Sequence, residues 1–352
     1  PNRHSIMASL EGSIFGIGNP LLDIIKDATD ADFATWGIAP GTTSLATDDQ
    51  KPLYPALLAT AGVTYVAGGA AQNTIRGAQW LLGVKGAASY SGSIAADATA
   101  ETLRNAAAAA GVTGLYYVTD KDATGSCAVL VKSAERALIA NIAAANHFDS
   151  AHLDTPEVAA AIEKARVFYA TGFFLTLPKG PETLIKIGKH CKEHNKIFVF
   201  NLGAPFLMEF FWTQLQSVLP YADFVICNEH EASAYATKAG WAEDRKDAAA
   251  KLASAPKENG ARGRVVIFTQ GPEATIVFKD GQVITYHPIK LDNSKIVDLN
   301  GAGDAFAAGI IAGLAKGVEL KEAIDAGHNA ACHVIQRSGP TYPAQPDFVW
   351  SQ

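Results

Sequence analysis

The stretch Asp298-Leu299-Asn300-Gly301-Ala302-Gly303-Asp304-Ala305-Phe306 lies between the alternating residues 295–297 and an apolar run that continues to Leu314. Small residues in this order predict a tight turn that enters the N-terminus of a buried helix. The unpaired backbone amides at such a helix end, together with the helix dipole, favour the binding of an anion. Glycines at 301 and 303 would let a phosphate approach the backbone closely.

Asp304 places a carboxylate where the turn predicts an anion site. It would repel an anionic ligand unless it took part in a reaction, for instance by accepting a proton. An ordinary aspartate N-cap beside a tight turn is the alternative interpretation. The spacing alone does not decide between the two.

The rest of the chain alternates short apolar segments with segments typical of helices. Strands are expected at residues 13–17, 167–170, 197–201, 224–227 and 265–269, and helices at 155–165, 181–194, 229–239, 244–253, 304–316 and 321–336. This alternation predicts an α/β protein with a doubly wound, mostly parallel sheet and helices on both faces. Residues 22–67 and 115–145 break the rhythm, which predicts a small, mostly β element inserted into that body.

Composition narrows the classes of protein. The chain has 352 residues, a formal net charge of −6 and 48% hydrophobic residues, so it can bury a large core and lacks the basic surplus of a nucleic-acid binder. It contains no apolar run of membrane-spanning length. Cys127, Cys191, Cys227 and Cys332 have no metal-ligand spacing, which favours reduced thiols and a cytoplasmic protein. Residues 1–6, before Met7, are interpreted as a cloning remnant outside the fold.

Polar residues follow several of the expected strands. Asn228 and Glu231 come after residues 224–227, and Thr269 and Gly271 end the next strand. Ligands of open α/β sheets bind beyond the carboxyl ends of the strands, so Asn228, Thr269 and Asp304 predict one shared site. The oxygens of Asn228 and Glu231 would suit Mg²⁺, although a capped helix start is an equal alternative.

Three well-known motifs are absent or broken. Gly16-Ile17-Gly18 begins a dinucleotide fingerprint, but Leu21 replaces the third glycine. His230-Glu231 begins a zinc-protease motif that fails at Ala234, and no P-loop sequence occurs. A nicotinamide dehydrogenase, a zinc protease and a P-loop enzyme are therefore not expected.

Two glycine-containing signatures together resemble the ribokinase-like family of carbohydrate and nucleoside kinases. They are Gly68-Gly69 with Asn73 near the N-terminus and Asn300-Gly301-Ala302-Gly303-Asp304 near the C-terminus, and Asn228 with Glu231 matches the family's N-x-x-E motif. Gly18-Asn19-Pro20-Leu21-Leu22-Asp23 and Phe268-Thr269-Gln270-Gly271 resemble the members that act on adenosine. The resemblance extends from about residue 13 to residue 348.

The resemblance implies a fold and a reaction. A large α/β nucleotide-binding domain would comprise residues 12–21, 68–114 and 146–352, and a small α/β lid would comprise 22–67 and 115–145. The implied reaction is transfer of the γ-phosphate of ATP to the 5′-hydroxyl of adenosine, giving AMP and ADP, with Mg²⁺ as cofactor, in purine salvage. The protein would be a cytoplasmic or nuclear monomer, with adenosine and ATP as its partners and neither nucleic acid nor a membrane among them.

The resemblance also implies roles for individual residues. Asp304 would be the base, the amides of Gly301, Ala302 and Gly303 would form the anion hole, and Arg136 would bring a cation to the phosphates from the lid. Asn228 and Glu231 would orient Mg²⁺ through water, and Asn228, Thr269, Gly271 and His328 would line the ATP side. The residues implied around adenosine are Asn19, Leu21, Asp23, Leu45, Gly69, Asn73, Cys127, Leu138, Phe174, Phe206 and Asn300, with Asp23 on the ribose hydroxyls.

Departures from the family pattern leave alternatives open. Ala70 and Gly203 stand where serine is common, and Leu299 replaces a frequent threonine. These changes leave the phosphoryl-transfer residues intact but bear on substrate preference. A kinase of the same fold that acts on another nucleoside or on a sugar is the first alternative. A nucleoside-binding protein without activity is the second, and Asp304 argues against it because a binder gains nothing from a carboxylate beside phosphate.

Overall fold

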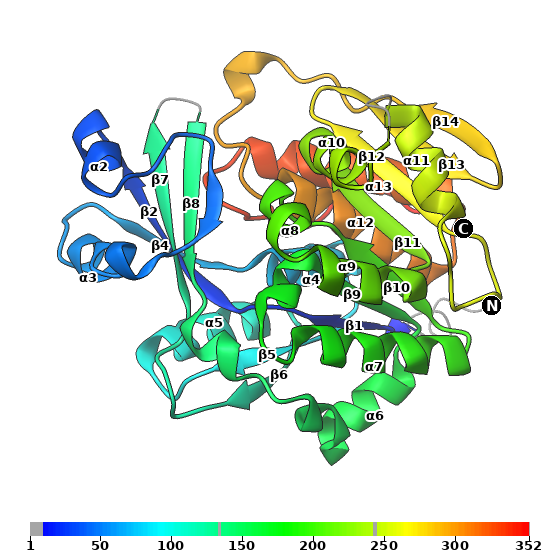
Figure 1. Cartoon of the computed structure of the whole chain (residues 1–352), viewed down its shortest axis with the longest axis horizontal. Helices are drawn as coiled ribbons and strands as arrows, with labels where there is room; N and C mark the ends of the chain where they lie inside the picture. The colour runs from blue at the N-terminus through cyan, green and yellow to red at the C-terminus, as the bar shows by residue number, and fades with distance from the viewer. Residues whose placement is uncertain (1–9, 133–134, 242–244, 352) are drawn as a thin grey trace.

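A nine-stranded sheet forms the centre of the protein (Figure 1). The computed structural model describes residues 10–132, 135–241 and 245–351, so the expectations for residues 1–6 and Asp244 lie outside the described part. The strand order is β14-β13-β12-β11-β10-β9-β1-β5-β6. In chain order the strands are β1 (Ile14–Ile17), β5 (Ala88–Ile94), β6 (Thr113–Val118), β9 (Val167–Thr171), β10 (Ile197–Asn201), β11 (Phe224–Asn228), β12 (Val265–Gln270), β13 (Glu273–Lys279) and β14 (Gln282–Tyr286). All neighbours pair in parallel except at the edge formed by β12, β13 and β14, which confirms the expected mostly parallel sheet.

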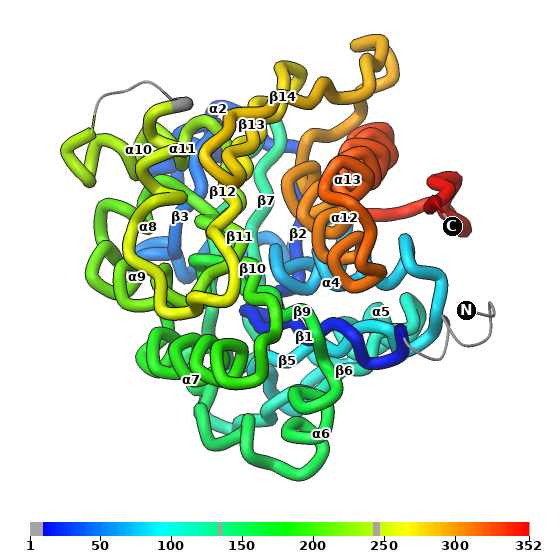
Figure 2. Tube along the Cα trace, turned by 90° about the vertical axis from the view of Figure 1, so that its right-hand side faces the viewer, coloured from blue at the N-terminus to red at the C-terminus, as the bar shows by residue number. Residues whose placement is uncertain are grey.

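Helices cover both faces of this sheet (Figure 2). One face carries α4 (Ala70–Leu82), α5 (Ala98–Ala109), α12 (Ala302–Lys316) and α13 (Leu320–Ile335). The other carries α6 (Pro156–Lys164), α7 (Gly180–Glu193), α8 (Pro205–Phe210), α9 (Trp212–Val218), α10 (Glu229–Lys238) and α11 (Arg245–Ser254). Because successive side chains of a strand point to opposite faces, β1 directs Ile14 into one core and Phe15 and Ile17 into the other. No helix within the described residues is long and apolar enough to cross a membrane.

A separate five-stranded sheet stands beside the carboxyl ends of the large-sheet strands (Figure 1). Its strands are β2 (Leu21–Asp27), β3 (Thr43–Leu45), β4 (Thr64–Gly68), β7 (Ser126–Lys132) and β8 (Glu135–Asn141), in the order β3-β8-β7-β2-β4. Two short helices, α2 (Asp30–Thr35) and α3 (Leu53–Leu58), pack on it around a small core that includes Ile24, Phe33 and Leu53. We call this unit the small sheet.

The expected boundary of the small sheet is wrong at residues 115–118, and it is one residue off at Leu21 and at Gly68, which pair with each other in the small sheet. Residues 115–118 belong to β6, which pairs in parallel with β5 at the edge of the large sheet. The helix α5 connects the two parallel strands, so β5, α5 and β6 form a β-α-β crossover unit. Leu115 and Tyr116 are buried in the two opposite cores of the large domain. After β6 the chain returns to the small sheet at β7.

Candidate active site

A cavity of about 590 Å³ lies between the two sheets. Its floor consists of the carboxyl ends of β9, β10 and β11 with Thr171, Asn201 and Asn228, and of the first turns of α4 and α12. Its roof consists of β2, β7 and β8 of the small sheet. The position agrees with the rule that ligands of open α/β sheets bind beyond the strand ends.

The first turn of α12 is built to leave its amides available. Gly301 is the N-cap residue with φ of 80°, a conformation that favours glycine, and no side chain caps the helix. A Cβ atom on Gly301 would lie 2.7 Å from Cβ of Pro340, whereas one on Gly303 would meet nothing within 4 Å because that position faces open space. Asp304 is the third residue of the helix, so the interpretation of Asp304 as an N-cap is wrong.

The alternating residues before this turn do not form a strand. Residues 296–300 form no strand but an extended loop, in which Ile296, Val297 and Leu299 are exposed. The loop is held by Asp298, whose Oδ1 accepts the amide of Asn300 at 2.7 Å and whose Oδ2 accepts the amide of Gly339 at 2.7 Å. The apolar residues of this segment therefore belong to an exposed connecting loop and not to a buried strand.

Asp304 lies at the floor of the cavity and is partly buried. Its Oδ2 accepts a hydrogen bond from Nδ2 of Asn73, at the first turn of α4, over 3.1 Å. Burial raises the pKa of Asp304 to about 7, although the hydrogen bond from Asn73 opposes the shift. A carboxylate with its pKa near neutrality is suited to take up a proton.

Asp23 is a second buried carboxylate in the same cavity, on β2. Burial and the nearby charge of Asp304 raise its pKa to about 7, against the opposing charges of Arg136 and Arg76. Gly68 makes room for it, because a Cβ atom there would lie 2.3 Å from Oδ1 of Asp23. Asp23 and Asp304 thus reach the cavity from different parts of the fold, one from a strand of the small sheet and the other from helix α12 of the large domain.

Two amide side chains beside these carboxylates have free acceptor atoms. Asn19 donates Nδ2 to the carbonyl of Phe173 at 3.1 Å, and its buried Oδ1 has no hydrogen-bond partner among the residues that the structure describes. The same part of the chain offers no partner to the buried Oδ1 of Asn73. Gly69, with φ of 90°, brings the backbone against Asn19, since a Cβ there would lie 2.3 Å from the Asn19 carbonyl oxygen. Unpaired buried acceptors lining a cavity are ready to accept hydrogen bonds from hydroxyl groups of a ligand.

Arg136 links the small sheet to the loop before α12. It extends from β8, and its Nη2 lies 2.5 Å from Oδ2 of Asp298. Its side chain is 13% exposed, and its buried Nη1 has no hydrogen-bond partner within the described residues. A cation from the small sheet thus lies beside the loop that leads into α12.

Asn228 and Glu231 form a capping box at the start of α10. Oδ1 of Asn228 accepts the amide of Glu231 at 2.9 Å, and Oε2 of Glu231 accepts the amide of Asn228 at 3.1 Å. Both side chains also line the cavity, so they cap the helix and reach the cavity at the same time. Burial raises the pKa of Glu231 to about 7.

Apolar side chains close the remaining walls. Those expected from the sequence that line the cavity are Leu21, Leu45, Cys127, Leu138 and Phe206. Phe174, which was also expected there, is instead fully buried against Phe148, while its neighbour Phe173 lines the cavity 6.2 Å from the ring of Phe206. In the 3₁₀ turn Gly172–Thr176 adjacent side chains point in different directions, so the sequence could not distinguish the two rings.

Four of the other expected residues do not line the cavity. They are Ala302, Thr269, Gly271 and His328. Thr269 donates its hydroxyl to the carbonyl of Cys227 at 3.4 Å, and Nε2 of His328 lies 2.9 Å from Oγ1 of Thr275 beneath the ring of Phe306. A place for Thr269, Gly271 and His328 on the ATP side remains a prediction.

Thirteen lining residues were not among the expected ones: Gly41, Thr43, Ser44, Ala70, Ala71, Ala140, Ile142, Thr171, Phe173, Asn201, Gly203, His230 and Leu299. Thr171 and Asn201 end β9 and β10, so the strand-end rule that selected Asn228 could have found them. Residues 41–44 come from the small sheet, and no local sequence signal marks them.

The chain belongs to the pfkB family of carbohydrate kinases, whose model, described as "pfkB family carbohydrate kinase", matches residues 32–347. Within this family, the relatives that the chain resembles are adenosine kinases. It is 43% identical to adenosine kinase 2 of Arabidopsis thaliana, over 97% of this chain and 99% of that one. It is 41% identical to the adenosine kinase of Dictyostelium discoideum, over 93% and 95% of the two chains.

Solved structures agree with this placement. The Anopheles gambiae adenosine kinase in complex with P1,P4-di(adenosine-5) tetraphosphate superposes with a TM-score of 0.92 at 36% identity, over 96% of this chain and 99% of that one. The Schistosoma mansoni adenosine kinase in complex with 2-fluoroadenosine has a TM-score of 0.90 at 34% identity, over 95% and 98%. The fold of this chain is thus that of known adenosine kinases.

Proposed function

We propose that this protein is an adenosine kinase, which transfers the γ-phosphate of ATP to the 5′-hydroxyl of adenosine and releases AMP and ADP. The full-length similarity to adenosine kinases supports the substrate. The observation that carries the chemistry is the partly buried carboxylate of Asp304 at the N-terminus of α12, beside backbone amides that no side chain of the described residues caps. This pairing suits the transfer of a negatively charged group to a hydroxyl.

Asp304 would act as the base. Its Oδ1 or Oδ2 would accept a hydrogen bond from the 5′-hydroxyl and take its proton as the oxygen attacks the γ-phosphorus. The raised pKa supports this role, because a base is most effective when its pKa lies near the working pH. Asn73 would hold the carboxylate in orientation through the hydrogen bond to Oδ2.

The amides of Gly301, Ala302 and Gly303 would stabilise the negative charge that spreads over the phosphoryl oxygens. Arg136 would add a cation, and its unused Nη1 supports this role. Asp298, which pairs with Nη2 and binds two backbone amides, would orient both the arginine and the turn. Phosphoryl transfer depends mainly on such positioning and electrostatic stabilisation.

Asn228 and Glu231 are the residues that would hold Mg²⁺, through water. Glu231 is a buried carboxylate at the cavity wall whose raised pKa reflects the cost of an uncompensated negative charge, which a cation would relieve. The oxygen donors fit the preference of this ion. When bound, Mg²⁺ would neutralise charge on the β- and γ-phosphates.

Asp23 and the free acceptors of Asn19 and Asn73 would receive the ribose hydroxyls. Phe173, Phe206 and the aliphatic walls would surround the base, which a sugar substrate lacks. This wall favours a nucleoside over the alternative of a bare sugar. That the enzyme is a monomer in the cytoplasm or nucleus remains a prediction of the family resemblance.

A coupled assay of ADP release with ATP and Mg²⁺ tests the proposal. The acceptors are adenosine, inosine, guanosine, 5′-deoxyadenosine and ribose. We expect turnover with adenosine and none with 5′-deoxyadenosine, which lacks the attacking hydroxyl. Turnover with ribose or inosine alone would refute adenosine as the substrate but would agree with Asp304 as the base. No turnover with any acceptor would overturn the kinase proposal for these substrates.

A further inference from the structure

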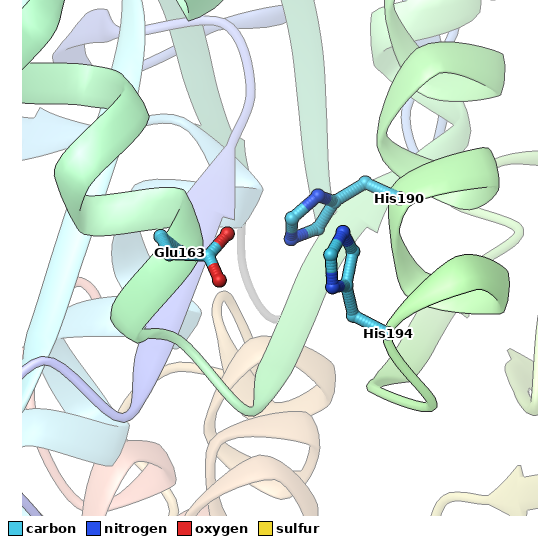
Figure 3. Close-up of side chains that lie close together, drawn as sticks. All are labelled: Glu163, His190 and His194. Atoms are coloured by element: carbon cyan, nitrogen blue, oxygen red, sulfur yellow. The ribbon is translucent and has the colours of Figure 1, made fainter.

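Three side chains that the kinase reaction does not use meet on the outside of the large domain. Glu163 is near the end of α6, and His190 and His194 lie four residues apart at the end of α7. One nitrogen or oxygen from each lies within 4.8 Å of the others. Figure 3 shows the carboxylate of Glu163 facing the two imidazole rings. Residues four apart on a helix share one face, which is why both rings point toward α6.

His190 has an unsatisfied nitrogen at this place. Its Nε2 is buried and has no hydrogen-bond partner within the described residues. Its ring lies 4.4 Å from that of His194, centroid to centroid, with an angle of 37° between the planes. A buried nitrogen without a partner, beside a second imidazole and a carboxylate, indicates a missing ligand.

The electrostatic surroundings are mixed but favour a cation. The C-terminal ends of α6 and α7, which carry the negative poles of their dipoles, meet here, and Glu163 adds a carboxylate. Lys196 opposes a cation, but its Nζ is already engaged by the carbonyls of Ile162 at 2.9 Å and Glu163 at 2.6 Å. Burial, together with the charges of Lys196 and His194, lowers the pKa of His190.

We propose that Glu163, His190 and His194 form a site for Zn²⁺ that joins the ends of α6 and α7. Two imidazole nitrogens and one carboxylate oxygen are ligands that Zn²⁺ accepts, with water in a fourth position. Bonds of about 2.0–2.2 Å in a tetrahedral arrangement require ligand atoms roughly 3.3–3.5 Å apart. Glu163 and His194 are exposed, so rotation of these two side chains can close the remaining gap.

The site lies away from the proposed reaction. The helix α6 leads into the start of β9, and α7 leads into the start of β10, so the three residues lie near the amino ends of these strands. The cavity contacts Thr171 and Asn201 at the opposite, carboxyl ends of the same strands. Bound zinc would therefore stabilise the native fold by tying two helices together, and it would leave kinase turnover unchanged.

Zinc titration of the full chain, freed of metal and kept in excess Mg²⁺, tests the site by calorimetry and by thermal unfolding. We expect one site, and a Tm that rises with zinc concentration. His194→Ala and Glu163→Gln change exposed side chains and should fold. Each should weaken zinc binding by more than the roughly 10–100-fold that loss of an outer-shell partner costs. Two matched controls, His287→Ala and Glu157→Gln, alter an exposed histidine and an exposed glutamate outside the cluster and should bind as the parent does.

Cobalt substitution adds a spectroscopic readout. Co²⁺ in a four-coordinate site of nitrogen and oxygen ligands should give visible absorption bands that disappear in His194→Ala. Unchanged zinc affinity in both His194→Ala and Glu163→Gln would overturn the proposal. So would zinc binding lost in Cys332→Ser but kept in His194→Ala, since Cys332 is the partly exposed thiol outside this cluster. Absence of any zinc-dependent change in Tm would overturn the stabilising role.

Discussion

Replacing Asp304 with asparagine should remove activity and yet stabilise the protein when no ligand is bound. Burial raises the pKa of Asp304 from its ordinary value of 3.8 to about 7. The folded state therefore binds more protons than the unfolded state between about pH 4 and pH 7, and stability falls as pH rises through this window. Above about pH 7 the carboxylate is ionised, and the loss in free energy of unfolding that its burial causes has reached its maximum.

The magnitude follows from the pKa difference. Each pH unit in the window costs about 1.4 kcal/mol, so the upper bound above pH 7 is about 4 kcal/mol. Asparagine has no charge to bury, keeps the shape of the side chain and can still accept the hydrogen bond from Asn73. The charge of Asp304 also raises the pKa of Asp23, so its removal relieves that carboxylate as well. A general base contributes typically about 10²–10⁴-fold to rate, and turnover should fall by that factor.

Urea unfolding without nucleotide, at pH 5 and pH 8, measures the stability effect. Asp304→Asn should gain stability over the parent, and the gain should grow by about 3 kcal/mol from pH 5 to pH 8. Asp27→Asn, at an exposed position, is the control and should show no such growth. An equal gain at both pH values, or a loss at pH 8, would refute the reasoning about the buried charge. Turnover within a factor of ten of the parent would refute the role as base.

Three further outcomes are expected. Asp23→Ala should raise the KM for adenosine by about 10–100-fold, because it removes hydrogen bonds to a charged group, and it should change the KM for ATP little. Equal changes of both KM values in steady-state kinetics would show that Asp23 does not bind the ribose. Phe173→Ala should weaken adenosine binding in calorimetry with little loss of stability, whereas Phe174→Ala should lower the free energy of unfolding by about 3–5 kcal/mol. The reverse pattern would show that Phe174 lines the cavity and that Phe173 belongs to the core. Asp298→Asn should lower the free energy of unfolding by roughly 3 kcal/mol and also lower kcat, because it breaks the buried ion pair with Arg136. An unchanged urea midpoint and an unchanged kcat would show that the loop does not depend on this ion pair.

Periodicity and composition predict most of the large domain, because its strands are buried on both faces. Strands such as residues 197–201 contain almost only apolar residues, and the structure places a strand at Ile197–Asn201. Residues 295–297 show the limit of the method. Ile296 and Val297 are also β-branched and apolar, but in the structure they lie in an exposed loop whose shape depends on Asp298 and Gly339, 41 positions apart. Local patterns carry no information about such a distant anchor.

The candidate site was predictable in part for a similar reason. Motif residues such as Asp304 and Asn73 were found by their glycine-rich contexts, and their hydrogen bond across 231 positions was not visible in the sequence. Phe173 and Phe174 share one chemistry, and only the 3₁₀ turn assigns one to the cavity and the other to the core. Residues 41–44 reach the cavity because the small sheet folds over it, which is a property of tertiary structure alone.

The position of β1 has a consequence for how the chain folds during synthesis. This first strand is in the middle of the large sheet, between β5 and β9, and β9 begins about 150 residues after β1 ends. At translation rates of about 5–20 residues per second, its second edge stays unpaired for on the order of 10 s. During that interval an apolar strand with an open edge emerges from the ribosome, and such an edge can pair with another chain. Nascent chains of this protein should therefore depend on protection by chaperones until β9 has emerged.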